Sequence, residues 1–222
     1  MLGDRDFKST IENSIDSVGS QLDYLIDKDN INKIHASEVT GCLRRSYFDR
    51  TDSLPTPRSR FADLLGGMFR NLEYGAKSAQ FSLDDLKLEG QADMIADDLI
   101  MVFKSVREFP DDPFARDILY INACMWIYDK VDAIIIYIDG NGKETSFSVT
   151  RNKKMFEELV RRVRVLHDLL KKKSIPILEP SVECTKCQYW ERCFTQRKES
   201  KTLNLMNLLG KSKNRSDILD EI

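Results

Sequence analysis

Three closely spaced cysteines near the carboxyl end constrain this chain more than any other feature of its sequence. Cys184, Cys187 and Cys193 fall within ten residues, in the pattern Cys-x2-Cys-x5-Cys. Thiols grouped this tightly are typical of a metal site, because isolated exposed thiols oxidise. A tetrahedral zinc site or a cubane iron–sulfur cluster needs a fourth ligand, for which His167 and Cys42 are the candidates. The local motif alone fits zinc as well as iron–sulfur.

The size and composition of the chain indicate one globular core. It has 222 residues, of which 41% are hydrophobic, enough to bury one sizeable core. The longest apolar run, Ala133–Ile138, is far too short to span a membrane, and Met1–Ser9 does not look like a secretory signal. We therefore expect a cytoplasmic protein with no membrane partner. In that compartment five cysteines argue against a disulfide framework.

The pattern of apolar residues and turn signals predicts a mixed α/β fold. Extended segments and turns predict two hairpins, Leu86–Ile95 with Leu99–Val106, and Val131–Ile138 with Thr145–Val149. Helices are expected at Ser37–Tyr47 with Ser37 as N-cap, at Phe61–Ser78, at Phe114–Tyr128, and along the stripe Phe156, Leu159, Val163, Leu166 and Leu170. This order favours a small central mixed sheet flanked by helices.

The same pass along the chain divides it into four parts. Residues 1–33 are expected to form a polar helical lead-in, residues 34–180 the core, residues 181–195 the cysteine module and residues 196–222 a partly mobile tail. The tail contains one apolar patch, residues 203–209, which either docks a partner or packs on the core as a final helix.

The segment around Cys42 identifies a relationship. Residues 34–48 begin a short helix at a serine and end in Cys42-Leu43-Arg44-Arg45 followed by aromatic residues. Together with the proline-containing lead to Cys193, this resembles the iron–sulfur branch of the RecB-like PD-(D/E)XK nuclease superfamily, closest to the CRISPR-associated RecB-type exonuclease family. The resemblance covers roughly residues 34–194.

The resemblance implies both a fold and a cofactor. The fold is a restriction-endonuclease-like core with a C-terminal four-cysteine module. The cofactor is a [4Fe-4S] cluster that ties the chain ends together, with zinc as the alternative. Its implied ligands are Cys42, Cys184, Cys187 and Cys193. Cys124, inside an apolar helical stretch, is expected to be a core residue.

The catalytic motif of that family is only partly present. Metal-dependent cleavage needs clustered carboxylates and a nearby lysine. In the family these are an aspartate at the end of one strand and Glu-x-Lys on the next. Asp93 and Lys104 match, but Val102 stands at the glutamate position and cannot bind a cation.

Other family positions have also changed. On the preceding helix Phe69 takes the place of a histidine, while Glu73 is kept. On the following helix Tyr120 and Cys124 take the places of a glutamine and a tyrosine. The implied catalytic residues are therefore Asp93, Lys104 and Glu73, in a vestigial or altered site.

Three hypotheses for function follow. The first is a DNA-binding pseudonuclease in which Arg44, Arg45 and Lys104 contact the phosphates of a single-stranded or end-containing DNA, as a subunit or scaffold in repair, replication or CRISPR adaptation. The second is an active exonuclease that uses magnesium or manganese and a displaced carboxylate, sought among Asp97, Asp98, Glu108 and Asp117. The third is a purely structural protein-interaction module.

The charge distribution leaves two interpretations open. The net charge is −2, less basic than is usual for a nucleic-acid-binding protein, but residues 151–173 are rich in lysine and arginine. This stretch predicts either a local positive face or an ordinary solvated helix surface. His35, just before the Ser37 helix, either faces DNA or the former active site or, as is more common for such a residue, is simply exposed.

Overall fold

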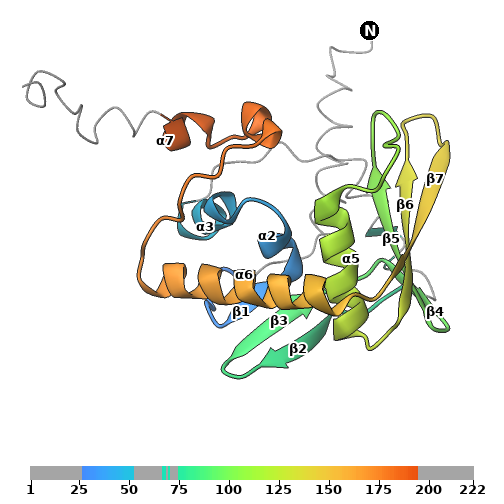
Figure 1. Cartoon of the computed structure of the whole chain (residues 1–222), viewed down its shortest axis with the longest axis horizontal. Helices are drawn as coiled ribbons and strands as arrows, with labels where there is room; N and C mark the ends of the chain where they lie inside the picture. Colours follow the sequence, from blue (N-terminus) through green and yellow to red (C-terminus); the bar gives the residue numbers. More distant parts are fainter. Residues whose placement is uncertain (1–26, 53–66, 69, 71–74, 195–222) are drawn as a thin grey trace, which may run out of the picture. The chain divides into compact units, whose positions relative to one another are not determined.

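The computed structural model describes residues 27–52, 67–68, 70 and 75–194 (Figure 1). The chain divides into two units, residues 1–177 and 178–222, and each is treated by itself. Most of the predicted lead-in, most of the predicted helix Phe61–Ser78 and nearly all of the predicted tail, with its patch at 203–209, lie outside the described residues. In the part of the chain described, no helix is both long and apolar enough to cross a membrane.

The first unit contains a three-stranded sheet with strand order β1-β3-β2. Its strands are β1 (Lys33–His35), β2 (Ala79–Leu83) and β3 (Leu86–Gly90). β1 pairs with β3 in parallel, and β2 pairs with β3 antiparallel. β2 has no counterpart among the predicted strands. The predicted helix Phe61–Ser78 is wrong at its end, because residues 75–78 are not helical and Gly75 forms a β-bridge with Met94.

The other sheet has four strands, in the order β4-β5-β6-β7, and is mixed. The strands are β4 (Met94–Ala96), β5 (Leu99–Ser105), β6 (Asp132–Ile138) and β7 (Glu144–Thr150). The two predicted hairpins are confirmed as the antiparallel pairs β4–β5 and β6–β7. The first prediction was wrong in one respect: Leu86–Ile95 is not one strand, because residues 91–93 separate β3 from β4, which belong to different sheets.

The helices described in the first unit are α2 (Ala36–Thr40), α3 (Leu43–Thr51), α5 (Ala115–Ile127) and α6 (Lys153–Lys171). The second unit contains η1 (Val182–Lys186) and α7 (Trp190–Phe194). α2, α5 and α6 pack on one another, and α3 also packs on α6 (Figure 1). The predicted helices over 114–128 and along the 156–170 stripe are confirmed, and all five stripe residues are buried.

The predicted single helix Ser37–Tyr47 is wrong. The chain forms two helices separated at Gly41 and Cys42, and the N-cap of the first is His35 rather than Ser37. His35 Nδ1 accepts the Ser37 N–H, while Glu38 Oε2 accepts the His35 N–H at 2.8 Å. This reciprocal capping box places the start of the helix two residues earlier than a serine cap would.

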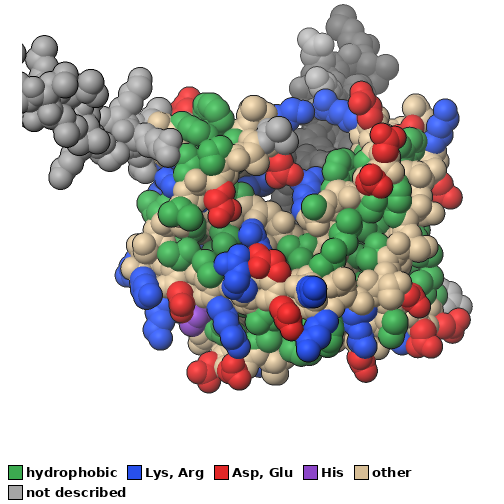
Figure 2. Space-filling view, viewed as in Figure 1, with side chains coloured by type: hydrophobic (Ala, Val, Ile, Leu, Met, Phe, Trp, Pro, Cys, Tyr) green, Lys and Arg blue, Asp and Glu red, His purple; other side chains and the backbone are tan. Residues whose placement is uncertain are grey.

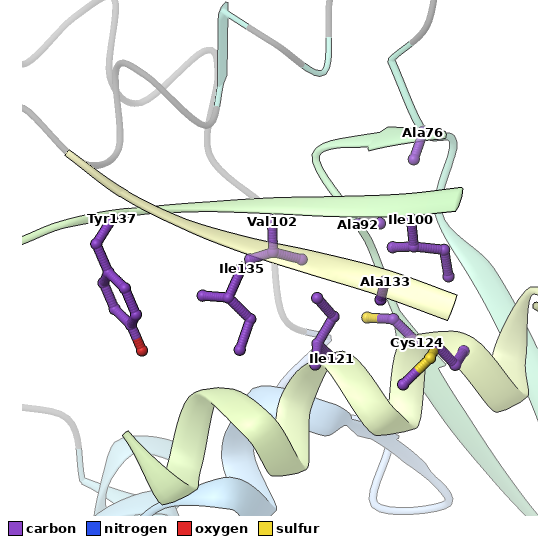
Figure 3. Packing of buried hydrophobic residues seen from close by; sticks show 10 residues of the cluster. Ala76, Ala92, Ile100, Val102, Ile121, Cys124, Ala133, Ile135 and Tyr137 are labelled. Carbon is purple, nitrogen blue, oxygen red and sulfur yellow. The ribbon is translucent and has the colours of Figure 1, made fainter. Parts of the chain in front are cut away.

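α5 crosses between the parallel strands β5 and β6 and covers one face of the sheet. Figure 3 shows Val102 and Ile135 pointing from these strands toward Ile121 on the helix. Cys124 lies in the same fully buried cluster, which confirms it as a core residue. Burial of each such side chain contributes about 1.5–3 kcal/mol.

A buried ion pair joins β1, α2 and α3. The Glu38 and Arg50 side chains are 5% and 2% exposed. Arg50 Nη2 donates to Glu38 Oε2 at 2.8 Å and also to the Lys33 carbonyl at 2.7 Å. Because its guanidinium is enclosed by these acceptors, Arg50 is a structural residue rather than part of a surface charge.

Candidate functional site

Asp93 lies in the link between β3 and β4, where one sheet gives way to the other. Its N–H donates to the Met101 carbonyl, so the link is held against β5. The carboxylate is largely buried and both oxygens are engaged: Oδ2 accepts the Phe103 N–H and Oδ1 accepts from Arg70 Nη1, each at 2.8 Å. Burial raises the pKa of Asp93, while the Phe103 N–H, Lys104 and Arg70 act in the opposite direction.

Arg70 is the residue that the sequence interpretation missed. Its guanidinium forms an ion pair with the buried carboxylate of Asp93, in the site where the resemblance places a divalent cation. The family motif gives no signal for it, because Arg70 stands next to the position aligned with a histidine, Phe69. Phe69 and Glu73 lie outside the described residues.

Lys104, at the carboxyl end of β5, lies beside Asp93 and Tyr120. Its Nζ is 5.0 Å from the centre of the Tyr120 ring, within the range of a cation–π contact. Tyr120 in turn donates its hydroxyl to the Gln91 carbonyl at 2.6 Å. Among the described residues, no carboxylate lies within ion-pair distance of Lys104 Nζ. Within this part of the chain, the Lys104 ammonium therefore lies over an aromatic face rather than in an ion pair.

His35 closes the other side of this group, and the expectation that it is exposed was wrong. The residue is 5% exposed, and its ring centre lies 6.1 Å from that of Tyr120. Burial lowers the pKa of His35 to about 3, with further lowering by Lys104, Lys33 and Arg50 and an opposing effect of Glu89. The imidazole is therefore neutral at physiological pH.

Glu89 is a second buried carboxylate, on β3 at the register position of His35. It forms an ion pair with Lys33 at 3.0 Å and accepts hydrogen bonds from Ser78 and Gln80. Its charge is therefore compensated by β1 and β2. The sequence interpretation did not consider it as a displaced carboxylate.

The four displaced carboxylates that were considered do not join Asp93 in the structure. Asp98 is exposed and pairs with Lys130, and Asp97 lies in the same turn with a positive φ. Asp117 accepts the Tyr137 hydroxyl at 2.9 Å, and Glu108 is exposed. Val102 is in the core. Among the described residues, no three His, Cys, Asp or Glu side chains are arranged to hold one metal ion.

Most of the predicted basic surface is used in contacts within the chain. Arg44 donates to the Pro176 carbonyl at 3.1 Å, and Arg45 forms a loose exposed pair with Asp49. Arg162 donates to the Val39 and Gly41 carbonyls and so caps the end of α2.

Along α6 the positive face gives way to mixed charges. The remaining arginines of residues 151–164 pair with acids: Arg151 with Asp129, Arg161 with Glu158 and Arg164 with Asp84. Figure 2 shows basic and acidic side chains interspersed over α6. The solvated helix surface is therefore the better interpretation of this stretch.

The three clustered cysteines lie in the second unit. Cys184 is in η1, Cys187 follows it, and Cys193 is in α7; all three cysteines are half-buried. The Cys187 N–H donates to the Cys184 carbonyl, which closes a tight turn between these two residues. Cys42 belongs to the first unit, at the start of α3. The thiols have the chemistry that a soft metal or an iron–sulfur cluster needs, although the described side chains are not gathered around one ion.

Comparisons with known proteins show a shared fold. No family model and no curated protein matches the sequence. The crystal structure of SSO0001 is similar at a TM-score of 0.61 and 15% identity, over 84% of this chain and 96% of that one. An alkaline exonuclease from Laribacter hongkongensis is similar at a TM-score of 0.44 and 10% identity, over 64% and 90% of the chains. A phage-related exonuclease from Haemophilus somnus 129PT follows at 0.41 and 14%, over 64% and 96%. The first shows that this chain has the fold of SSO0001; the other two are too loose to carry an argument.

Proposed function

We propose that this chain is a nucleic-acid-binding protein built on a nuclease-like core that no longer cleaves. The observation that carries the proposal is the ion pair between Arg70 and Asp93, beside a Val102 that supplies no carboxylate. A fixed guanidinium here neutralises the aspartate that the motif reserves for a metal ion.

The charge pattern explains why cleavage is not expected. A divalent cation in such a site needs several oxygen ligands, and it acts by activating a water molecule and stabilising the developing phosphate charge. Both oxygens of Asp93 already accept hydrogen bonds. The Arg70 guanidinium can only donate hydrogen bonds, so it cannot coordinate and activate a water molecule as a metal ion does. The site therefore keeps positive charge without Lewis-acid chemistry of its own.

The same pattern favours binding of a phosphate. Among the described residues of this group, Lys104 and Arg70 carry two positive charges and Asp93 one negative charge, His35 is neutral, and Glu89 is paired with Lys33. The ammonium of Lys104 contacts only the Tyr120 face among its described neighbours, so a phosphate can approach it without displacing an ion pair. We infer that Lys104 contacts the backbone of a single-stranded or end-containing DNA, a contact that positions the strand without reading its sequence.

The cysteines belong to the same proposal. Cys42, with Cys184, Cys187 and Cys193, is proposed to hold a [4Fe-4S] cluster, with zinc as the alternative. Such a centre would supply a cross-link over a long loop, which stabilises a chain by restricting its unfolded states. A protein partner in a DNA-processing complex is also proposed. The resemblance described above suggests the cluster, and the apolar patch at 203–209 in the sequence suggests the partner.

The test is DNA binding by the full chain beside a nuclease assay. A fluorescent single-stranded oligonucleotide would be titrated at several salt concentrations with wild type, Lys104→Ala and Lys172→Ala. Lys172 is an exposed lysine at the end of α6 and serves as the matched control. We expect Lys104→Ala to weaken binding several-fold and to reduce the salt slope by about one, whereas Lys172→Ala leaves both nearly unchanged.

The nuclease assay uses magnesium and manganese at high protein excess. We expect no cleavage. Cleavage by wild type that disappears in Lys104→Ala would establish the active exonuclease instead. If the protein neither binds nor cleaves DNA, the structural interaction module replaces both hypotheses.

A further inference from the structure

One long-range contact fixes the chain shortly before the three clustered cysteines. Arg44 lies at the start of α3, two residues after Cys42. Its Nη1 donates to the Pro176 carbonyl at 3.1 Å, across 132 residues of the sequence. Pro176 is buried, whereas residues 171–175 and Ile177 are exposed. Within the first unit, Arg44 therefore anchors an otherwise exposed segment at the point from which the chain leads to the cysteines.

The guanidinium of Arg44 is held in place but is only partly satisfied. Its Cζ lies 5.7 Å from the centre of the fully buried Phe48 ring, within the range of a cation–π contact. The Nε atom is buried and finds no hydrogen-bond acceptor among the residues that the structure describes. No described carboxylate pairs with Arg44, whereas Arg50 on the same helix pairs with Glu38. A buried donor without an acceptor is costly, so the Nε–H and the charge of Arg44 call for an anionic partner.

A metal centre bound by thiolates has the matching chemistry. Four thiolates carry more negative charge than a zinc ion or a cubane iron–sulfur core carries positive charge, so the whole centre is anionic. Its sulfur atoms accept N–H hydrogen bonds, which orient the ligands and set the reduction potential of a cluster. Cys42 supplies the nearest of the four proposed sulfurs along the chain. A DNA phosphate is also anionic, but a buried Nε is closed to a strand that approaches from solvent, which favours the cysteine centre.

We propose that Arg44 is a positioning residue of the cysteine centre. Through Nη1 it anchors the chain at Pro176, and through its charge and its Nε–H it stabilises the thiolate sulfurs around the metal. This role rests on the cysteine centre proposed above and is independent of DNA binding. Arg44 then acts at the metal, in place of the phosphate contact predicted from the sequence. Removal of its charge should loosen the metal and make an iron–sulfur cluster harder to reduce.

Two variants separate the charge of Arg44 from its anchoring bond. Arg44→Lys and Arg44→Gln can both donate to the Pro176 carbonyl, but only the lysine keeps the positive charge. Arg45→Lys and Arg45→Gln are the matched controls, because Arg45 is exposed and forms only a loose pair with Asp49. The full-length proteins would be purified anaerobically and assayed for iron, acid-labile sulfide and zinc. The readouts are the rate of metal release to a chelator and, for a cluster, its midpoint reduction potential.

The two variants should differ from each other as well as from the wild type. We expect Arg44→Gln to release its metal several-fold faster than the wild type and to lower the midpoint potential of a cluster. Arg44→Lys should show smaller changes in both, since the charge remains, and the Arg45 variants should match the wild type. If Arg44→Gln fails to fold, Arg44→Lys and Arg45→Lys decide, because a lysine lacks the Nε–H: faster release from Arg44→Lys alone supports the proposal, and equal release overturns it.

Three further outcomes overturn the role of Arg44 while the cysteine centre stands. The first is a metal-bound wild type whose release rate and potential are shared by the Arg44 and Arg45 variants. The second is an equal change in Arg44→Gln and Arg44→Lys, because Arg44 would then act only through Pro176. The third is weaker binding of labelled single-stranded DNA by Arg44→Gln with no change at the metal, which would favour the phosphate contact. A wild type that holds no iron, sulfide or zinc even after anaerobic reconstitution would instead overturn the cysteine centre itself.

Discussion

Replacing Arg70 by alanine should destabilise the protein much more at pH 8 than at pH 5. In the wild type, the Asp93 carboxylate is 8% exposed and Arg70 is its partner at 2.8 Å. Removing the guanidinium leaves the carboxylate with the Phe103 N–H and the more distant charge of Lys104. A buried charge that loses its partner typically destabilises a protein by about 3–5 kcal/mol.

Protonation of Asp93 limits this loss. The buried carboxylate can bind a proton instead of remaining charged. For a carboxyl group with an ordinary pKa of 3.8, this protonation costs about 1.36 kcal/mol for each pH unit above 3.8. The limit on the charge-related loss is therefore about 5.7 kcal/mol at pH 8 but only about 1.6 kcal/mol at pH 5. Burial already raises the pKa of Asp93, so its contribution to stability falls as the pH rises; without Arg70 this fall becomes steeper. We expect losses of about 3–5 kcal/mol at pH 8 and under about 2 kcal/mol at pH 5.

Urea unfolding at the two pH values measures the difference. The chain contains two tryptophans, and Trp126 is in α5 of the same unit, so fluorescence follows unfolding. Arg45→Ala is the matched control, because Arg45 forms an exposed pair with Asp49 at 3.7 Å and should change stability by less than about 1 kcal/mol at either pH.

Adding Asp93→Asn to Arg70→Ala should abolish most of the pH dependence, since no carboxylate is then left to titrate. The reasoning is refuted if Arg70→Ala loses equal stability at both pH values. It is also refuted if the loss at pH 8 is no larger than that of Arg45→Ala.

Three further predictions follow from the same structure. His35→Gln should reduce the loss of unfolding free energy between pH 7.5 and pH 5. In the wild type the buried imidazole has a pKa of about 3, whereas the unfolded imidazole binds protons below its ordinary pKa of 6.5, so this group alone should lower the stability by about 2 kcal/mol over that range. Denaturant titrations at both pH values check this, and the control His167→Gln should keep the loss. Arg50→Met should lower the free energy of unfolding by about 3–5 kcal/mol because Glu38 stays buried without its partner, and equal stability of Arg50→Met and an Arg45→Met control would contradict the ion-pair argument. Cys187→Ser should remove iron and acid-labile sulfide, with their visible absorption, from anaerobically purified protein, whereas Cys124→Ser, in the apolar core, should retain them; zinc that is present in Cys124→Ser and lost from Cys187→Ser would favour the alternative metal.

Much of the fold was predictable where local patterns and tertiary contacts agree. The apolar stripe of α6 recurs at helical spacing, and each of its residues is buried in the structure. The Asp139–Gly142 tract turns the chain between β6 and β7, with Asp139 Oδ1 accepting from the Asn141 and Lys143 N–H groups. These signals lie within a few residues of each other, so the sequence alone is sufficient.

The candidate site was only half predictable, because its remaining features depend on distant contacts. Asp93 and Lys104 follow from a motif, but the ion pair to Arg70 spans 23 residues and has no local pattern. His35 is followed by small and polar residues, and it is buried because Tyr120 and β3 lie against it. In the sequence, Arg162 resembles the other basic residues of a helix surface. In the structure it donates to the Val39 carbonyl at the end of α2.

The pair between Arg70 and Asp93 also bears on how this sequence can change over generations. Val102→Glu alone would bury a new carboxylate in the core while Arg70 still forms its ion pair with Asp93. Loss of Arg70 alone would leave the buried Asp93 carboxylate without this partner. Each single substitution lowers stability, and only the two together offer a cation a second ligand. Recovery of a metal site therefore lies across a fitness valley, and descendants of this chain should keep the aspartate for its place in the fold, whether or not any ancestor used it for cleavage.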